Sequence, residues 1–229
     1  MLEIIIRSIK DFFDKKILFT SLIPIVIAAL FWGVVFFIFH TQIKHFILYI
    51  VGHIPFIGSK SWVADTIEAV GGIFIYYELL IMTSVMMVGI IADKVVDRIN
   101  NKYYQLEKRG FGTFIGSMSV SIKQNTLFFI LFVIFIPAMF IPGVNILVNI
   151  ILWMILIKKP TFYDSIAMIA SKDEYRNLLN SNKTKTFLIT LLGAALFLVP
   201  FFGVFVYILQ LLMFANYNLL RLSDMRRKK

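Results

Sequence analysis

Hydrophobic residues fill long uncharged blocks of this chain, and short segments rich in Lys and Arg separate the blocks. Residues 17–39 form the first block. Residues 69–92 form a second block, whose single charged side chain is Glu78. At about 1.5 Å per residue, a helix of either length crosses a hydrocarbon core of about 30 Å. We therefore predict two long membrane-spanning helices, and we expect Pro24 to kink the first one near its end.

Three segments outside these blocks mix apolar and charged positions. Residues 1–14 have apolar side chains at helical spacing, which predicts an amphipathic helix lying in the membrane interface. For residues 40–68 we expect an interfacial helix or loop, with Trp62 at the headgroup level. Residues 93–109 predict an amphipathic continuation of the second span. Its polar face mostly carries Asp93, Lys94, Asp97, Arg98 and Lys102, and Gly110 and Gly112 end it.

Two further uncharged blocks, residues 124–157 and 186–220, are each interrupted by proline and glycine. The first contains Pro142 and Gly143, and the second contains Pro200 and Gly203. The apolar arms of the first block reach only about 20–23 Å, which is short of the hydrocarbon core. We predict two short helical hairpins tipped by Pro and Gly. Both half-depth hairpins and complete double crossings would return each block to its own side. Arm length favours half-depth hairpins for the first block and is marginal for the second. Repeats of this kind are found in many transport proteins.

The distribution of Lys and Arg decides whether each of these blocks returns to its own side. If both blocks return, 21 of the 23 Lys and Arg residues lie on one face, and only Lys44 and Lys60 lie on the other. This is a strong positive-inside pattern with both termini in the cytoplasm. A single kinked crossing per block would leave six basic residues outside, namely Lys158, Lys159, Lys172, Arg176, Lys183 and Lys185. We therefore favour hairpins.

Composition supports an all-α integral membrane protein that forms one domain over residues 1–229. The chain is 59% hydrophobic with a mean hydropathy of +0.85, so it is not a soluble domain. It has no cysteine, which excludes disulfides, thiolate metal sites and thiol catalysis. The net charge of +10 is explained by cytoplasmic loops held against anionic lipid, without nucleic acid as a partner.

Motifs for catalysis or cofactor binding are missing from the sequence. There is no nucleophile elbow, P-loop, Rossmann glycine pattern or pair of catalytic carboxylates, so we expect neither an enzyme nor a cofactor. His40, His45 and His53 lack the i, i+4 spacing of helical metal ligands, so we expect no metal site. Two capping-box patterns, beginning at Thr161 and Ser171, predict two consecutive helix starts, and Asp164 would have a structural role in the first.

Glu78 is the most informative single residue, because a carboxylate near the middle of a bilayer is costly. One interpretation is a proton-carrying or gating group, as in a proton-coupled transporter. The other is a neutral or paired Glu at a helix–helix or subunit contact.

Four sequence features together resemble a known family and cover most of the chain. They are FFDKKILFTSLIP at residues 12–24, IPAMFIPGVN at 136–145 followed by LWMIL at 152–156, the pair Tyr163 and Asp164, and a second short hairpin near the C-terminus. These features resemble the CysZ family of bacterial sulfate permeases and, more distantly, the etoposide-induced membrane proteins of the same superfamily.

The resemblance implies two long transmembrane helices and two pairs of helices that penetrate part way into a bacterial inner membrane. It also implies a homo-oligomer that admits sulfate for cysteine synthesis. The family binds sulfate through a Gly-Leu-Arg motif at the start of its first long helix. The matching stretch here, residues 16–19, has neither the glycine nor the arginine, and only Lys15 and Lys16 lie near.

We therefore predict transport of a small oxyanion, with sulfate as the expected substrate, without ATP hydrolysis. Lys15 and Lys16 are candidate ligands at the start of the first span, where we expect Asp14 to be the N-cap. A helix N-terminus with basic neighbours suits an oxyanion, although membrane anchoring explains both lysines as well. Thr20 and Asn145 could add polar contacts, or bond their own helices. The alternative function is a non-transporting membrane scaffold or envelope factor of the same superfamily, which the missing motif favours.

Overall fold

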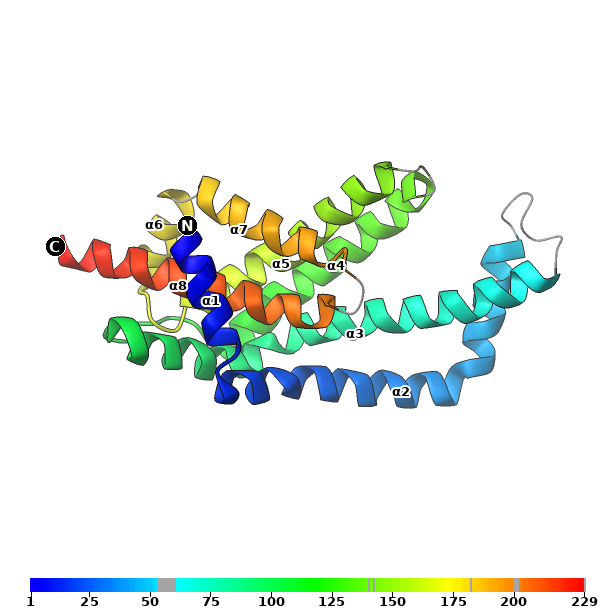
Figure 1. The fold of residues 1–229 in the computed structure, drawn as a ribbon, viewed down its shortest axis with the longest axis horizontal. Coiled ribbons are helices and arrows are strands. Elements are labelled where there is room, and N and C mark those ends of the chain that lie inside the picture. Colours follow the sequence, from blue (N-terminus) through cyan, green and yellow to red (C-terminus); the bar gives the residue numbers. More distant parts are fainter. Residues whose placement is uncertain (53–60, 140, 142, 182, 200–201, 229) are drawn as a thin grey trace. The chain divides into compact units, whose positions relative to one another are not determined.

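The computed structural model describes residues 1–52, 61–139, 141, 143–181, 183–199 and 202–228, and it is helical without strands over these residues (Figure 1). The elements are α1 (Leu2–Phe12), α2 (Lys15–Gly52), α3 (Ser61–Ile99), a π-helical turn η1 (Asn100–Tyr104), α4 (Phe114–Met139), α5 (Val144–Ile166), α6 (Lys172–Ser181), α7 (Lys183–Leu196) and α8 (Gly203–Arg227). The all-helical class predicted from the sequence is confirmed.

Five helical segments among the described residues are long and apolar enough to cross a membrane. They are Lys15–Tyr49, Gly71–Tyr104, Phe114–Met139, Val144–Ile166 and Phe205–Arg227. These lengths and compositions establish a membrane protein with several apolar helices. The 14-residue helix α7 is not among them.

The two long helices extend beyond the uncharged blocks that predicted them. Helix α2 continues past Phe39, where the backbone leaves helical dihedrals with φ −105° and ψ 19°, so the break lies there and not at Pro24. Helix α3 runs on through the π-turn and stops at Gln105, whose φ of 51° is left-handed. It therefore ends before the predicted stop at Gly110. The predicted interfacial position of Trp62 concerns a side chain that lies outside the described part of the chain.

The first hairpin is longer than the uncharged arms suggested. Helix α4 has 26 residues and α5 has 23, because Lys123, Lys158 and Lys159 lie inside these helices and do not end them. Lys is a good helix former, so a charge ends an apolar block without ending the helix. At about 1.5 Å per residue, both helices exceed a core of about 30 Å. The prediction that the two arms of this hairpin are too short to cross the core is therefore wrong, because the helices are longer than their apolar segments.

The first predicted capping box does not start a helix. Thr161 lies inside α5, and Asp164 is a buried residue of its last turn, so the structural role predicted for Asp164 as part of a cap is wrong. The second box is confirmed, because Ser171 N donates to Glu174 Oε2 at 2.8 Å and Glu174 N donates to Ser171 Oγ at 3.3 Å. Helix α6 begins at the next residue, Lys172.

The second hairpin is asymmetric. Helix α7 has 14 residues, about 21 Å, and α8 has 25 residues. At the tip of the first hairpin, Gly143 has a φ of 83°, which L side chains rarely adopt. Pro142 and Pro200, which the sequence placed at the two turns, lie outside the described residues.

The chain forms two compact units, residues 1–23 with 85–229 as the first and residues 24–84 as the second. In the second unit, α2 and α3 pair through side chains within the apolar blocks. Trp32 Nε1 donates to Thr83 Oγ1 at 2.8 Å, and Tyr76 Oη donates to the carbonyl of Ala29 at 3.0 Å. The rings of Phe36 and Tyr76 meet edge to face at 5.3 Å. These contacts hold the two long helices together.

Helix α8 is the centre of the first unit. It packs against α1, α5, α6, α7 and the π-turn, and Figure 1 shows it between α1 and α5. Its side chains from Tyr207 to Ile208 and from Leu211 to Leu219 are at most 2% exposed. A helix that is buried on every side belongs inside a protein rather than against lipid. Trp153 of α5 stacks on Phe197, with ring centroids 4.3 Å apart, and so packs α5 against the residue that follows α7.

Helix α1 is fixed to this core by its polar face. Asn216 Nδ2 donates to Ser8 Oγ at 3.3 Å and to Asp11 Oδ2 at 3.2 Å. Asp11 is 1% exposed and also accepts from Lys102 Nζ and Tyr103 Oη, each at 2.8 Å. The apolar side chains Leu2, Ile6, Ile9 and Phe13 are 43–71% exposed. The polar face of α1 therefore packs on protein and its apolar face is exposed, and the interfacial position of this helix stays a prediction.

Glu174 gives a test of acid stability. Its carboxylate pairs with Arg226 at 2.9 Å, and this partner lowers the pKa of Glu174 from 4.5 to about 2. Because the folded pKa lies below the unfolded value, the stabilisation is complete above about pH 4.5 and is lost as the pH falls through about 2. We expect Glu174→Gln to lower the Tm at neutral pH and to match the wild type near pH 2. Thermal unfolding between those pH values measures this, and the exposed neighbour Asp173, changed to Asn, serves as the control. A constant gap between Glu174→Gln and wild type would contradict the assignment.

Hairpin depth can be measured in this cysteine-free chain with single cysteines at the two tips. Phe202 is 40% exposed beside the start of α8, and Gly143 is exposed at the first tip. We expect Phe202→Cys to resist an impermeant thiol reagent added outside intact cells, because α7 is too short to reach the far side. Gly143→Cys is the comparison, since α4 and α5 are long enough. Both cysteines must react after detergent solubilisation. Labelling of Phe202→Cys from outside would establish a full crossing.

Candidate functional site

The start of α2 is held in a defined position by Asp14. The carboxylate accepts a hydrogen bond from the backbone N–H of Lys16 at 3.0 Å, which is the N-cap expected from the sequence. A few residues on, Tyr207 Oη of α8 donates to the carbonyl of Ser21 at 2.9 Å, and Ser21 is fully buried. The first two turns of α2 therefore belong to the first unit.

Arg98 brings α3 to the same place. Its guanidinium donates to Asp14 Oδ2 through Nη2 at 2.8 Å and through Nε at 3.2 Å. The Arg98 hydrogen bonds hold the pKa of Asp14 below its usual range, so this carboxylate stays ionised at neutral pH. Asp14 thus caps one helix and pairs with a cation on another.

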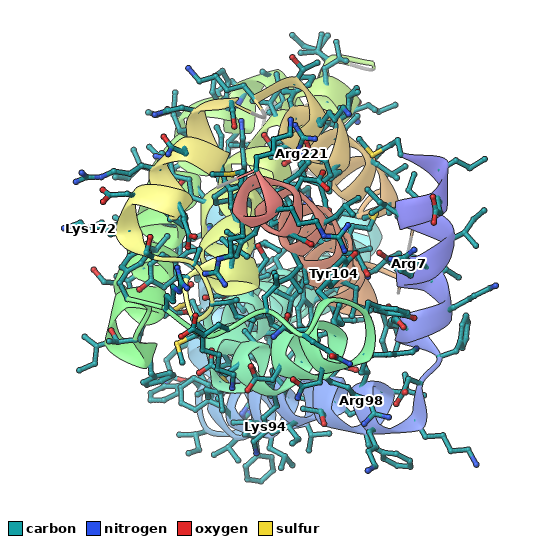
Figure 2. The ribbon with its side chains drawn as sticks, turned by 90° about the vertical axis from the view of Figure 1, so that its left-hand side faces the viewer. Arg7, Lys94, Arg98, Tyr104, Lys172 and Arg221 are labelled. Carbon is teal, nitrogen blue, oxygen red and sulfur yellow. The ribbon has the colours of Figure 1, made fainter. Side chains whose placement is uncertain are left out.

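A cleft of about 190 Å³ opens between these two helices. Its lining consists of Lys16, Ile17, Thr20, Lys94, Val95 and Arg98. Three of these side chains are cationic and none is a carboxylate. Figure 2 shows the labelled Lys94 and Arg98 at the same edge of the molecule, beside the first turns of α2. Lys16 and Lys94 are exposed, and Ile17 and Val95 form the buried apolar floor.

A second, wider cleft of about 610 Å³ shares Lys94 and Arg98 with the first. It adds Asp14, Asp97, Asn101 and Lys102 to the lining. The two carboxylates make it less positive, and Asp97 is already paired with Lys108. The smaller cleft is therefore the more favourable position for an anion.

The chemistry of the smaller cleft suits an oxyanion. The N-terminus of a helix and the Lys and Arg side chains around it attract negative charge and donate hydrogen bonds to oxygen. Thr20 contributes less than expected, because its Oγ1 donates to the carbonyl of Lys16 at 2.7 Å and so bonds its own helix. Lys16 and Lys94 are the groups left to neutralise an anion, because Arg98 is already paired with Asp14.

The structure brings together two of the residues predicted from the sequence and adds two others. Lys16 and Thr20 line the cleft, whereas Lys15 is exposed and is not part of that lining. Lys94 and Arg98 were not selected as ligands from the sequence. Their i, i+4 spacing on the polar face of residues 93–109 was the available signal, because it places both on one side of the helix.

Asn145 has a local role at the tip of the first hairpin. Its Oδ1 accepts from the backbone N–H of Gly143 at 3.1 Å and of Ile146 at 2.8 Å. It does not line the cleft beside Lys16. The positive φ of Gly143 and this cap together form the start of α5.

Glu78 lies in the second unit on α3, in the part of the helix that pairs with α2. Its Oε2 is buried and makes no hydrogen bond with other described residues. A carboxylate oxygen without a partner in an apolar segment is costly in its ionised form. The structure therefore leaves the predicted proton or gating role as a hypothesis.

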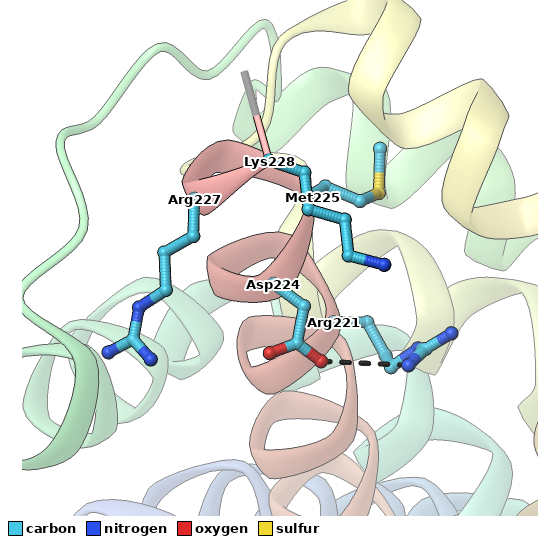
Figure 3. A pocket seen from close by; sticks show the side chains of 5 residues that line it. All are labelled: Arg221, Asp224, Met225, Arg227 and Lys228. Atoms are coloured by element: carbon cyan, nitrogen blue, oxygen red, sulfur yellow. Dashed lines mark ion pairs between the residues drawn. The ribbon is translucent and has the colours of Figure 1, made fainter.

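Another basic pocket, of about 290 Å³, lies at the C-terminal end of α8. It is lined by Arg221, Asp224, Met225, Arg227 and Lys228 (Figure 3). Asp224 Oδ2 faces Arg221 Nη1 at 3.5 Å and so provides an internal counter-charge. The C-terminus of a helix carries a partial negative charge, which opposes an anion. The cleft at the start of α2 is therefore the better candidate.

No metal cluster is found in the part of the chain that the structure describes. There, three or more His, Asp or Glu side chains do not gather at a single point. A divalent metal centre usually needs several such ligands.

Comparison with known proteins gives one match. Residues 4–207 match the model of the family described as sulfate transporter CysZ/Etoposide-induced protein 2.4. No curated protein and no solved structure matches the chain significantly. The family match covers most of the chain, from α1 into α8, and it agrees with the apolar helices. The chain therefore belongs to the family of sulfate transporter CysZ and etoposide-induced protein 2.4.

Proposed function

We propose that this protein carries a small inorganic oxyanion, with sulfate as the substrate, across the bacterial inner membrane. The cleft between the start of α2 and α3 is its binding site on one side of the membrane, and Lys16, Lys94 and Arg98 are its ligands. The protein uses no ATP, so flux follows a gradient or is coupled to protons. The family description names a sulfate transporter and no enzymatic activity, which supports this proposal.

The observation that carries the proposal is a cleft lined by three cations and no carboxylate at the N-terminus of a long helix. The family resemblance places its sulfate motif at the start of this same helix. Here the motif is missing from α2, and two cations of α3, Lys94 and Arg98, lie beside the start of α2 instead. Lys94 therefore supplies charge that the missing arginines would have provided.

The membrane arrangement follows from charge and exposure. The positive-inside distribution of Lys and Arg supports cytoplasmic termini, so the cleft beside Lys16 faces the cytoplasm. Helix α2 exposes large apolar side chains, such as Leu30 at 66% and Phe37 at 84%. Lipid and a second copy of this chain both suit such a surface. We include a homo-oligomer in the proposal on this basis.

A non-transporting scaffold is the second candidate, and one observation favours it. The Asp14 carboxylate already neutralises Arg98, and an ion pair of this kind can serve only to hold α2 and α3 together. A scaffold needs the helices to pack and requires no anion to bind in the cleft.

Uptake of radiolabelled sulfate into proteoliposomes tests the site. We expect Lys94→Gln to raise the half-saturating sulfate concentration about tenfold, because a charge-assisted hydrogen bond contributes about 1.5–3 kcal/mol. Lys94→Arg keeps the charge and the uptake. Lys172→Gln is the matched control, since Lys172 is an exposed lysine at the start of α6, away from the cleft (Figure 2). Wild-type flux equal to that of protein-free vesicles would refute sulfate transport and favour the scaffold. Normal uptake by Lys94→Gln would refute the site alone.

Glu78 is proposed as the proton-coupling group of this transport. Glu78→Gln cannot ionise, so we expect its sulfate uptake to lose the dependence on an imposed pH gradient while some flux remains. Uptake is measured with and without the gradient, at equal protein incorporation. Glu3→Gln, an exposed change on α1, is the control. A pH dependence identical to that of wild type would remove Glu78 from the coupling mechanism.

A further inference from the structure

We propose that an enclosed cavity between α3, α4 and α5 is a binding site for one small monovalent cation. The cavity measures about 10 Å³, which is the room that one water-sized occupant needs. Its polar lining consists of Asp93, Thr113, Ser117, Tyr163 and Asp164. The site lies in the first unit and is separate from the basic cleft, because the two share no lining residue.

Two polar side chains in this cavity are buried and lack partners. Asp164 and Ser117 are each 5% exposed. Asp164 Oδ2 and Ser117 Oγ meet hydrogen-bond geometry with no other described residue, and the Ser117 side chain lies near the Asp164 carboxylate. A buried polar group without a partner is unfavourable, and a buried ionised carboxylate is far more so. Asp164 therefore borders a space that one small occupant fits, and its buried Oδ2 is available to such an occupant.

The lining favours a cation and excludes an anion. Two carboxylates, Asp93 and Asp164, border a space too small to separate them well, and like charges this close repel. No Lys or Arg lines the cavity to balance them. All the side-chain donors are oxygens, which are the ligands that hard, weakly polarisable cations prefer. One positive charge between the carboxylates would reduce their mutual repulsion and supply the missing counter-charge.

Local packing keeps the hydroxyl oxygens in place. Thr113 Oγ1 accepts from the backbone N–H of Gly116 at 3.0 Å, and Tyr163 Oη accepts from the N–H of Thr113 at 3.3 Å. A Cβ at Gly89 would overlap Ser117 Oγ, so glycine at this position is what allows Ser117 to approach α3. The hydroxyl and carboxylate oxygens therefore converge because no side chain intervenes.

The charged and titratable groups around the cavity are few. Asp97 lies one turn beyond Asp93 on α3 and is paired with Lys108 of the following loop. Tyr163 lines the cavity from α5, and the phenol of Tyr175 on α6 is close enough to sense the charge of Asp164. Lys108 is the cation that acts on Asp93 from outside the lining, and it is already engaged by Asp97. The cavity therefore needs its own positive charge.

Sodium fits both the size and the charge of this site, whereas a proton would become part of one carboxyl group and leave the space empty. The inference does not depend on sulfate transport, since it concerns binding and is measured on purified protein. A negative result for cation binding would therefore leave the proposed transport function unaffected, and the reverse is also true.

The test is thermal unfolding of the purified full-length protein in detergent, with Na⁺ replaced by choline at constant ionic strength, over a range of pH. A ligand that binds only the folded state raises the Tm as its concentration rises. If sodium is the occupant, the wild-type Tm rises with Na⁺ at alkaline pH, and Asp164→Asn loses that response. If Asp164 only takes up a proton, Na⁺ has no effect while the Tm difference between wild type and Asp164→Asn changes with pH, and this outcome refutes the cation site.

Two further variants keep the result interpretable if Asp164→Asn does not fold. Ser117→Ala leaves both carboxylates in place and removes one oxygen, so we expect about a tenfold weaker cation response, which corresponds to about 1.4 kcal/mol. Asp173→Asn removes an exposed carboxylate of α6 and is expected to keep the full wild-type response. The proposal is overturned if Na⁺ and choline give equal Tm values for the wild type over the whole pH range.

Discussion

Asp14 accepts hydrogen bonds from the backbone of Lys16 and from the guanidinium of Arg98, and this carboxylate fixes the start of α2 against α3. The contact joins residues 84 positions apart in the chain. Without this carboxylate, the cations at the start of α2 and on α3 would face one another with no negative charge between them, and like charges repel. One carboxylate therefore makes a basic cleft possible, and the geometry of Lys16 and Lys94 depends on it.

The last turns of α3 carry two sites of opposite charge on two faces. Lys94 and Arg98 line the basic cleft, whereas Gly89 and Asp93 line the enclosed cavity with Asp164. Residues four apart lie on one face of a helix, so a shift of one position moves a side chain round to another face. The proposed anion site and the proposed cation site therefore lie less than three turns apart on one helix.

The buried helix α8 holds the elements around these polar sites in place through hydrogen bonds to α1 and α2. Its fully buried Asn216 donates to Ser8 and Asp11 and so connects α1 to the core. Buried polar groups that are hydrogen-bonded rigidify the structure around them. Tyr207, from the same helix, bonds the carbonyl of Ser21 and holds α2 near the cleft. The apolar surface of α2 is left to face lipid or another copy of the chain.

The sequence by itself determined the class of the protein, its long apolar helices, the capped start of α2 at Asp14 and the capping box at Ser171. These features depend on hydrophobic blocks and on contacts within one or two helical turns, which a linear pattern contains. It misjudged the first hairpin, because Lys123 ended an apolar block but not the helix. Only the tertiary structure placed Lys94 and Arg98 beside Lys16, and only it showed that Asp164, predicted as part of a cap, is a buried carboxylate lining a cavity with Asp93. The physical reason is distance along the chain, because both sites join separate helices whose packing no local pattern specifies.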